Sequence, residues 1–160
     1  MVEEEAPVEG AAGGRDAMAT TREAAVEAAH RAYYAAWEAG DGNAIMAAWA
    51  DDDRICCVLP GNPPHHGRVE VWDRILEGLD LTPGLQFVFS DVVVTVRDDL
   101  ARLTCVETVI TPETFDQGPE MEAALAKLAV TSLFVHTDHG WKLWHHQAGP
   151  MLTHLRLERE

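Results

Sequence analysis

The chain has 160 residues, and its 27 acidic and 12 basic residues give a formal net charge of −15 at pH 7. A chain of this length fits one domain with a substantial core. The acidic excess repels phosphate backbones and anionic lipid, and no basic cluster interrupts it, so we expect neither a nucleic-acid partner nor a membrane partner.

Residues 1–18 combine several glutamates and glycines with little bulky apolar content, which predicts a flexible acidic tail before a domain over residues 19–155. The N-terminus lacks the basic region and apolar run of a secretory signal, and no stretch of about 18 apolar residues occurs, which predicts a cytoplasmic protein. The three cysteines form no disulfide framework, and no short-spaced Cys or His pattern indicates a metal site.

Helices are predicted in the first half of the domain. A capping box at Thr20–Glu23 precedes apolar residues at helical spacing, which predicts a long helix over about Thr21–Ala39. Asp41 or Asn43 can cap a short second helix that reaches Trp49. Apolar residues from Val69 to Leu79 predict a third helix with one apolar face.

Between the second and third helices, the pattern predicts a short buried strand over Arg54–Leu59. A Pro-Gly-rich loop follows this strand, because neither a helix nor a ladder crosses Pro60–Pro64. His65 and His66 then lie on a loop above the sheet edge, where they either close a pocket mouth or remain in solvent.

The second half of the domain predicts an antiparallel meander. The β-rich segments are Leu85–Val96, Leu100–Ile110, Leu128–Thr137 and Trp141–Gln147, and hairpin-sized turns join the first two and the last two. Helices followed by such a sheet indicate an α+β fold with the helices on one face. Residues 112–124 form either an acidic loop or a partly helical excursion.

The element order and four sequence runs carry a family resemblance. The runs are AYYAAWEAGDGNAIMAAWADDD, VLPG followed by HHGR, LTCVE, and GWKLWHHQAGP. They resemble the SnoaL-like branch of the nuclear-transport-factor-2-like superfamily from residue 20 onward. The resemblance implies a cone in which a curved antiparallel sheet wraps the long N-terminal helix. Its members include isomerases, dehydratases, hydrolases and polyketide cyclases, beside proteins without catalysis.

Three ionisable residues are candidates for catalysis. Strand alternation puts His145 and His146 on opposite faces, and the resemblance implies that His146 faces the cone, with Trp144 on the same side. Glu107 shares a strand face with apolar residues, so burial would raise its pKa toward neutrality. We expect His146 and Glu107 to form a proton-transfer pair, with Asp91 as a third candidate beside a possible bulge.

Further side chains are expected to line a substrate pocket, because aromatic residues on the helices and small or polar residues at the sheet edge can surround a hydrophobic ligand. They are Tyr33, Trp37, Trp49, Cys56, His65, His66, Trp72 and Trp144. A tyrosine hydroxyl from the first helix could stabilise an enolate.

Three functions remain open at this stage: a small-molecule enzyme using acid/base chemistry, such as isomerisation, cyclisation, dehydration or hydrolysis; a non-catalytic ligand-binding protein; and a dimerisation module. We favour the enzyme. No Gly-rich phosphate loop follows a strand, so no nucleotide or flavin cofactor is expected, and a metal would need the distant His65, His66 and His146. Apolar residues on both strand faces predict a homodimer through the outer sheet face.

Overall fold

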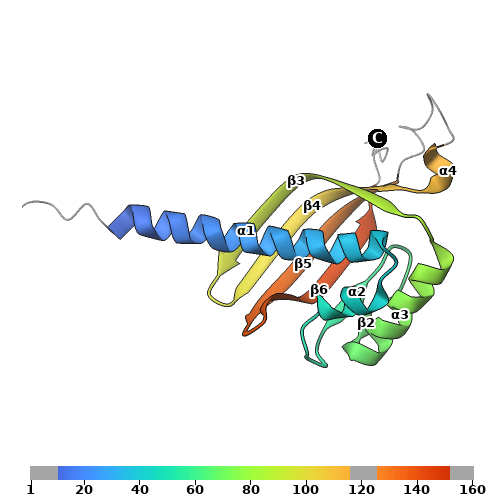
Figure 1. Ribbon diagram of the computed structural model, residues 1–160, viewed down its shortest axis with the longest axis horizontal. Helices are drawn as coiled ribbons and strands as arrows, with labels where there is room; N and C mark the ends of the chain where they lie inside the picture. The colour runs from blue at the N-terminus through green and yellow to red at the C-terminus, as the bar shows by residue number, and fades with distance from the viewer. Residues whose placement is uncertain (1–10, 116–125, 152–160) are drawn as a thin grey trace, which may run out of the picture.

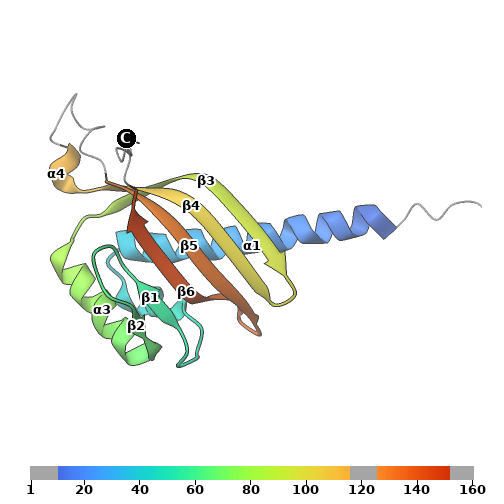
Figure 2. The same cartoon turned by 180° about the vertical axis from the view of Figure 1, so that it is seen from behind.

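The computed structural model describes residues 11–115 and 126–151, and these form a curved sheet with helices against its concave face (Figure 1). The long helix α1 (Ala11–Glu38) crosses that face and contacts β3, β4 and β6. Seen from behind, the four long strands lie between the viewer and α1 (Figure 2). None of the helices in the described residues is long and apolar enough to cross a membrane.

The first helix begins earlier than the sequence predicts. Residues 11–18, which the sequence places in the flexible tail, are helical, and the N-terminal part of α1 extends beyond the sheet (Figure 1). The three alanines in this stretch favour helix, whereas the adjacent Gly13 and Gly14 oppose it. The remainder of the predicted tail, residues 1–10, lies outside the described residues.

Two shorter helices complete the layer on the concave side. Helix α2 (Gly42–Ala47) is capped by Asp41, whose Oδ1 accepts a hydrogen bond from the Ala44 backbone N–H at 3.0 Å. Helix α3 (Gly67–Leu81) follows the edge strands. The one-turn helix α4 (Pro112–Phe115) occupies the start of the segment that could have been loop or helix, and residues 116–125 are not described.

The six-stranded sheet has the order β2-β1-β6-β5-β4-β3. Its long strands are β3 (Gln86–Arg97), β4 (Leu100–Ile110), β5 (Ala126–Thr137) and β6 (Gly140–Pro150), paired antiparallel as predicted. The short strand β1 (Cys56–Val58) runs parallel to β6. The two-residue strand β2 (His65–His66) pairs with β1, so these histidines form the sheet edge rather than a loop above it.

A β-bulge changes which residues of β6 face the helices. The register with β5 shifts between Leu133, which pairs with His145, and Phe134, which pairs with Leu143, so Trp144 is the extra residue. Trp141 and Leu143 are therefore buried before the bulge, and His146 and Ala148 are buried after it. The uninterrupted alternation assumed from the sequence was wrong, although His146 does face inward.

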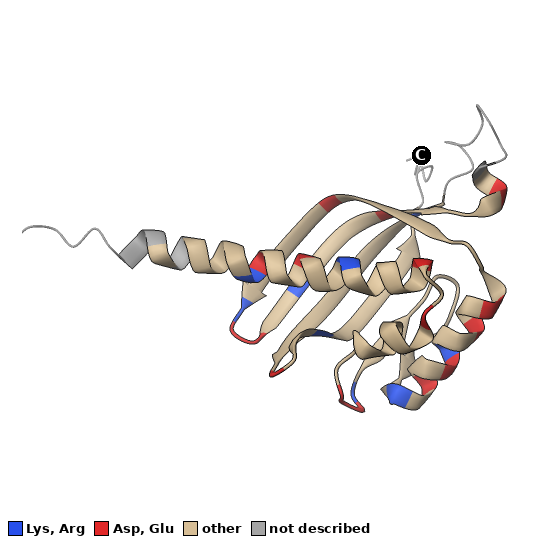
Figure 3. Ribbon diagram, in the orientation of Figure 1, with Lys and Arg blue, Asp and Glu red and all other residues tan. Residues whose placement is uncertain are grey.

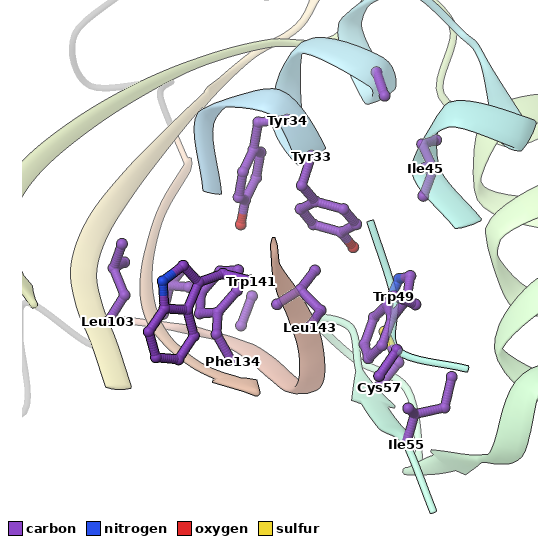
Figure 4. Close-up of a cluster of buried hydrophobic side chains, with 14 of the residues drawn as sticks. Tyr33, Tyr34, Ile45, Trp49, Ile55, Cys57, Leu103, Phe134, Trp141 and Leu143 are labelled. Atoms are coloured by element: carbon purple, nitrogen blue, oxygen red, sulfur yellow. The ribbon is translucent and has the colours of Figure 1, made fainter. Parts of the chain in front are cut away.

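The core packs between α1 and the sheet (Figure 4). Tyr33 and Tyr34 extend from α1 toward the sheet, where Leu103, Phe134 and Leu143 are buried. Charged side chains lie mainly on the helices, the turns and the strand ends, with Asp and Glu more frequent than Lys and Arg (Figure 3). The interior strand positions are mostly uncharged, which makes a buried ionisable group conspicuous.

Candidate functional site

A cavity of about 310 Å³ lies between α1, α3 and the concave face of the sheet. Most of its wall is apolar, with Trp37 from α1, Phe87 from β3, and Leu128 from β5 among the contributing side chains. The loop between β1 and β2 adds Leu59 and Pro60. A mostly apolar cavity with few polar groups is typical of a small-molecule site.

Four polar side chains form a chain of contacts beside this cavity. The Tyr34 hydroxyl donates a hydrogen bond of 2.5 Å to Glu107 Oε2, and its oxygen lies 3.4 Å from His146 Nε2. His146 Nδ1 lies 2.8 Å from Ser132 Oγ. A neutral His146 protonated at Nε2 satisfies every contact, because Ser132 then donates to Nδ1 and Nε2–H points at Tyr34. In this series of contacts Ser132 donates to His146, His146 to Tyr34 and Tyr34 to Glu107.

Glu107 is the buried carboxyl group of the site, and the residue is 3% exposed. Desolvation raises its pKa to about 7, against the smaller opposing effect of the Tyr34 hydrogen bond. Near neutral pH the carboxyl group therefore exists in both protonation states, which suits a group that takes up and returns a proton. Among the described residues, its second oxygen, Oε1, has no hydrogen-bond partner.

Tyr34 and His146 remain neutral around the carboxyl group. Burial raises the pKa of the Tyr34 phenol well above its usual value, and the neighbouring Glu107 adds to this rise. Burial also lowers the pKa of His146 to about 3, with smaller contributions from His30 and His145. Because full burial disfavours the imidazolium, His146 stays in its neutral form near pH 7.

Aromatic packing fixes the positions of these groups. The Tyr33 ring packs edge-on against His146 with ring centroids 5.3 Å apart, and Tyr34 packs against Phe87 and Phe89 at 4.9 Å and 4.7 Å. Edge-to-face pairs at these separations are favourable arrangements of aromatic rings. The donors directed at Glu107 are thus held by the core itself.

Four of the residues predicted for the site line this cavity: Glu107, His146, Tyr33 and Trp37. Glu107 shares the inward face of β4 with Ala101, Leu103 and Cys105, as strand alternation predicted. The geometry therefore brings together both members of the predicted pair, with Tyr34 between them.

The predicted Asp91, His65 and His66 lie outside the cavity wall. Asp91 is exposed on the bulge of β3, where its φ of 53° is tolerated by the short polar side chain, so it shapes the bulge instead of the site. His66 is exposed, and its backbone N–H donates to Glu70 Oε2 at 2.8 Å at the start of α3.

Four other residues predicted to bind substrate are also absent from the cavity wall: Trp49, Cys56, Trp72 and Trp144. Trp49 is buried against Tyr33, with ring centroids 6.2 Å apart, and so belongs to the core behind the wall. Trp144 is the bulge residue of β6. Of the five aromatic residues predicted for the pocket, Tyr33 and Trp37 line the cavity, and Trp49, Trp72 and Trp144 do not.

The sequence prediction missed Tyr34, Ser132 and Arg74. Tyr34 could have been found, because it lies four residues after His30 and three before Trp37 on the buried stripe of α1. Ser132 is harder to find from the sequence, because its only mark is a hydroxyl group at a strand position on the same face as the buried apolar residues of β5. Arg74 is a cation on α3 that lines the cavity together with Gly78 and Leu81, at helical spacing.

A metal or redox role has no support in the described part of the chain. Within residues 11–115 and 126–151, no three His, Cys, Asp or Glu side chains are placed to hold a metal ion. Burial raises the pKa of Cys57 and of Cys105 to about 12, so both thiols remain protonated and weakly nucleophilic.

Comparison with known proteins identifies the family. The model of the SnoaL-like domain matches residues 26–153. A structure from Streptomyces avermitilis, of a protein of the NTF2-like family provisionally named a dehydratase, shares 33% identity over 84% of this chain and 99% of that one, with a TM-score of 0.72. No protein in the curated set gives a significant match.

Two further structures show the same fold. A protein from Thiobacillus denitrificans, provisionally named a calcium/calmodulin-dependent protein kinase type II association domain, has 27% identity and a TM-score of 0.67, over 78% of this chain and 94% of that one. A ketosteroid isomerase-like protein from Erwinia carotovora atroseptica has 20% identity and a TM-score of 0.59, over 81% and 96%. These likenesses confirm the predicted α+β cone.

Proposed function

Because the chain belongs to the family of SnoaL-like domains, we propose that it is an enzyme that moves a proton on a hydrophobic small molecule held in the cavity. Glu107 is the base that accepts the proton and the acid that returns it. The observation that carries this proposal is a carboxyl group with a pKa of about 7 that lines an apolar cavity and receives a hydrogen bond from Tyr34.

The proposed step uses the free oxygen of Glu107. Oε1 removes a proton from a carbon next to a carbonyl group, and the electron pair moves onto the carbonyl oxygen as an enolate. The same carboxylic acid then returns the proton to another atom of the substrate, which completes an isomerisation, or it protonates a leaving hydroxyl group, which completes a dehydration. The names of the relatives from Streptomyces and Erwinia support this class of reaction.

Tyr34 and His146 tune Glu107 in this scheme. A hydrogen bond from Tyr34 stabilises the carboxylate, while desolvation destabilises it, and the balance places the pKa near neutrality. The neutral His146 supports the Tyr34 oxygen from its other side, and Ser132 holds the imidazole orientation. His146 is therefore a positioning residue in this proposal rather than the proton carrier expected from the sequence.

Solvent deuterium exchange tests the proposal with a simple ketone in place of the natural substrate. The apolar ketone 2-tetralone is incubated with the protein in D₂O, and loss of its α-proton signals is followed by NMR. We expect the wild-type protein to accelerate exchange and Glu107→Gln to lose about 10²- to 10⁴-fold of that acceleration. Asp91→Asn is the matched control, because that carboxylate is exposed outside the cavity.

A non-catalytic binding protein is the second candidate. The mainly apolar wall and the neutral His146 favour it, because both suit retention of a hydrophobic ligand. Saturable binding of 2-tetralone with exchange no faster than in buffer would support this candidate and contradict catalysis.

A further inference from the structure

Arg74 is a cation on the wall of an otherwise largely apolar cavity. It lies on α3, one turn before Gly78, and its side chain is only 13% exposed. Burying a guanidinium in such surroundings is costly unless its donors are satisfied. Which of those donors the protein itself satisfies therefore bears on what the cavity can hold.

Only one edge of the guanidinium is used by the protein. Nη1 donates to Glu77 Oε2 at 2.6 Å, within the same helix. Nε is buried without a hydrogen-bond partner, and Nη2 has none among the described residues. Nε–H and the Nη2–H on its side point in the same direction, and this pair is the fork that binds a carboxylate with two parallel hydrogen bonds.

Arg74 and Glu107 form two separate polar regions of one cavity. They make no ion pair with one another, and Arg74 is not among the groups that shift the pKa of Glu107. If Arg74 were buried only to neutralise Glu107, the two groups would form an ion pair, and Arg74 would shift the pKa of Glu107. Glu107 therefore does not take up the two unpaired donors of Arg74.

We propose that Arg74 selects substrates that carry a carboxylate, and that its Nε–H and Nη2–H bind this group while the apolar body of the molecule fills the cavity. The inference rests on the proposed function, because the carboxylate held by Arg74 would anchor one end of the substrate and bring its activated C–H group to Glu107. The ligand class is an amphipathic organic acid with a carbonyl-activated C–H group. The apolar part of this ligand would pack against Trp37 from α1 and Phe87 from β3, which both line the cavity.

The test compares two probes that differ in charge. Binding of 2-naphthoate and of the neutral 2-naphthylmethanol is measured by isothermal titration calorimetry at pH 6, where Glu107 is largely protonated. A hydrogen bond to a charged group is worth enough for a preference of roughly 10- to 100-fold for naphthoate. We expect Arg74→Gln to remove this preference and leave the affinity for 2-naphthylmethanol within about twofold.

Two further variants isolate the fork. Arg74→Lys retains the charge without the planar fork, so an intermediate preference is expected. Arg102→Gln removes one positive charge from an exposed position on β4 and should change neither affinity. Circular dichroism establishes that each variant is folded, and if Arg74→Gln does not fold, Arg74→Lys decides the matter.

Two results with the wild-type protein would overturn the inference: equal affinity for the two probes, or binding of neither probe up to about 1 mM. An unchanged preference in folded Arg74→Gln would also overturn it. Where that variant does not fold, an unchanged preference in Arg74→Lys would do so. Its failure is distinct from failure of the proposed function. Glu107→Gln should retain the naphthoate preference while losing ketone exchange. A retained preference without any exchange in the wild-type protein would leave Arg74 as the anchor of a binding protein.

Discussion

Burial of Glu107 makes the stability of the fold depend on pH. The unfolded chain releases this proton near the ordinary pKa of 4.5, whereas the folded protein retains it up to about pH 7. Between these values the folded state binds more protons than the unfolded state, so the free energy of unfolding falls as the pH rises. The contribution is fully present below pH 4.5 and is lost above pH 7.

The size of this effect follows from the pKa. Each pKa unit corresponds to about 1.4 kcal/mol, so a rise from 4.5 to about 7 amounts to roughly 3 kcal/mol. Glu107→Gln retains an oxygen that can accept from Tyr34 and has no charge to bury. Part of this contribution is already lost at pH 5, so relative to the wild-type protein the variant should gain about 2.5 kcal/mol in unfolding free energy between pH 5 and pH 9.

Urea unfolding followed by tryptophan fluorescence at pH 5, 7 and 9 measures this difference. The lowered pKa values of His30 and His146 also destabilise the fold as the pH falls below about 6.5. Comparison of the two proteins at each pH removes the contributions of these and other titrating groups. Asp73→Asn, an exposed position on α3, is the control and should show a constant difference. A constant difference for Glu107→Gln as well would refute the raised pKa.

Three other expectations concern the hydrogen bonds and the outer face. Tyr34→Phe should raise the pKa of Glu107 by about one to two further units, measured from the carboxylate infrared band, and a lowered pKa would contradict the contact. Ser132→Ala should cost about 1–3 kcal/mol in urea unfolding, because it leaves His146 Nδ1 buried without a donor, whereas the outward Thr104→Ala should cost little. Sedimentation should give a mass near twice 17.6 kDa, since Val88 and Val93 are more than half exposed on β3, and a mass of 17.6 kDa would exclude the proposed dimer.

Strand periodicity predicted one wall of the site well and the other only in part. Alternation along β4 buries Ala101, Leu103, Cys105 and Glu107 together, because that strand runs without a bulge over these residues. In β6 the extra residue Trp144 reverses the parity, so that Leu143 and His146 both face inward. Nothing in the local sequence distinguishes a bulge at Trp144 from a regular strand, and the family resemblance supplied the orientation of His146.

The charge states of the site could not be predicted from the sequence, because they depend on burial that arises only when α1 covers the sheet. Desolvation affects the two members of the predicted pair in opposite directions, raising the pKa of the acid Glu107 and lowering that of the base His146. Both groups are therefore held near their neutral forms, and only the carboxyl group still titrates near pH 7. The same burial that costs stability above neutral pH is what prepares Glu107 to exchange a proton there, so a variant that stabilises the fold by removing this carboxyl group should also remove the proposed activity.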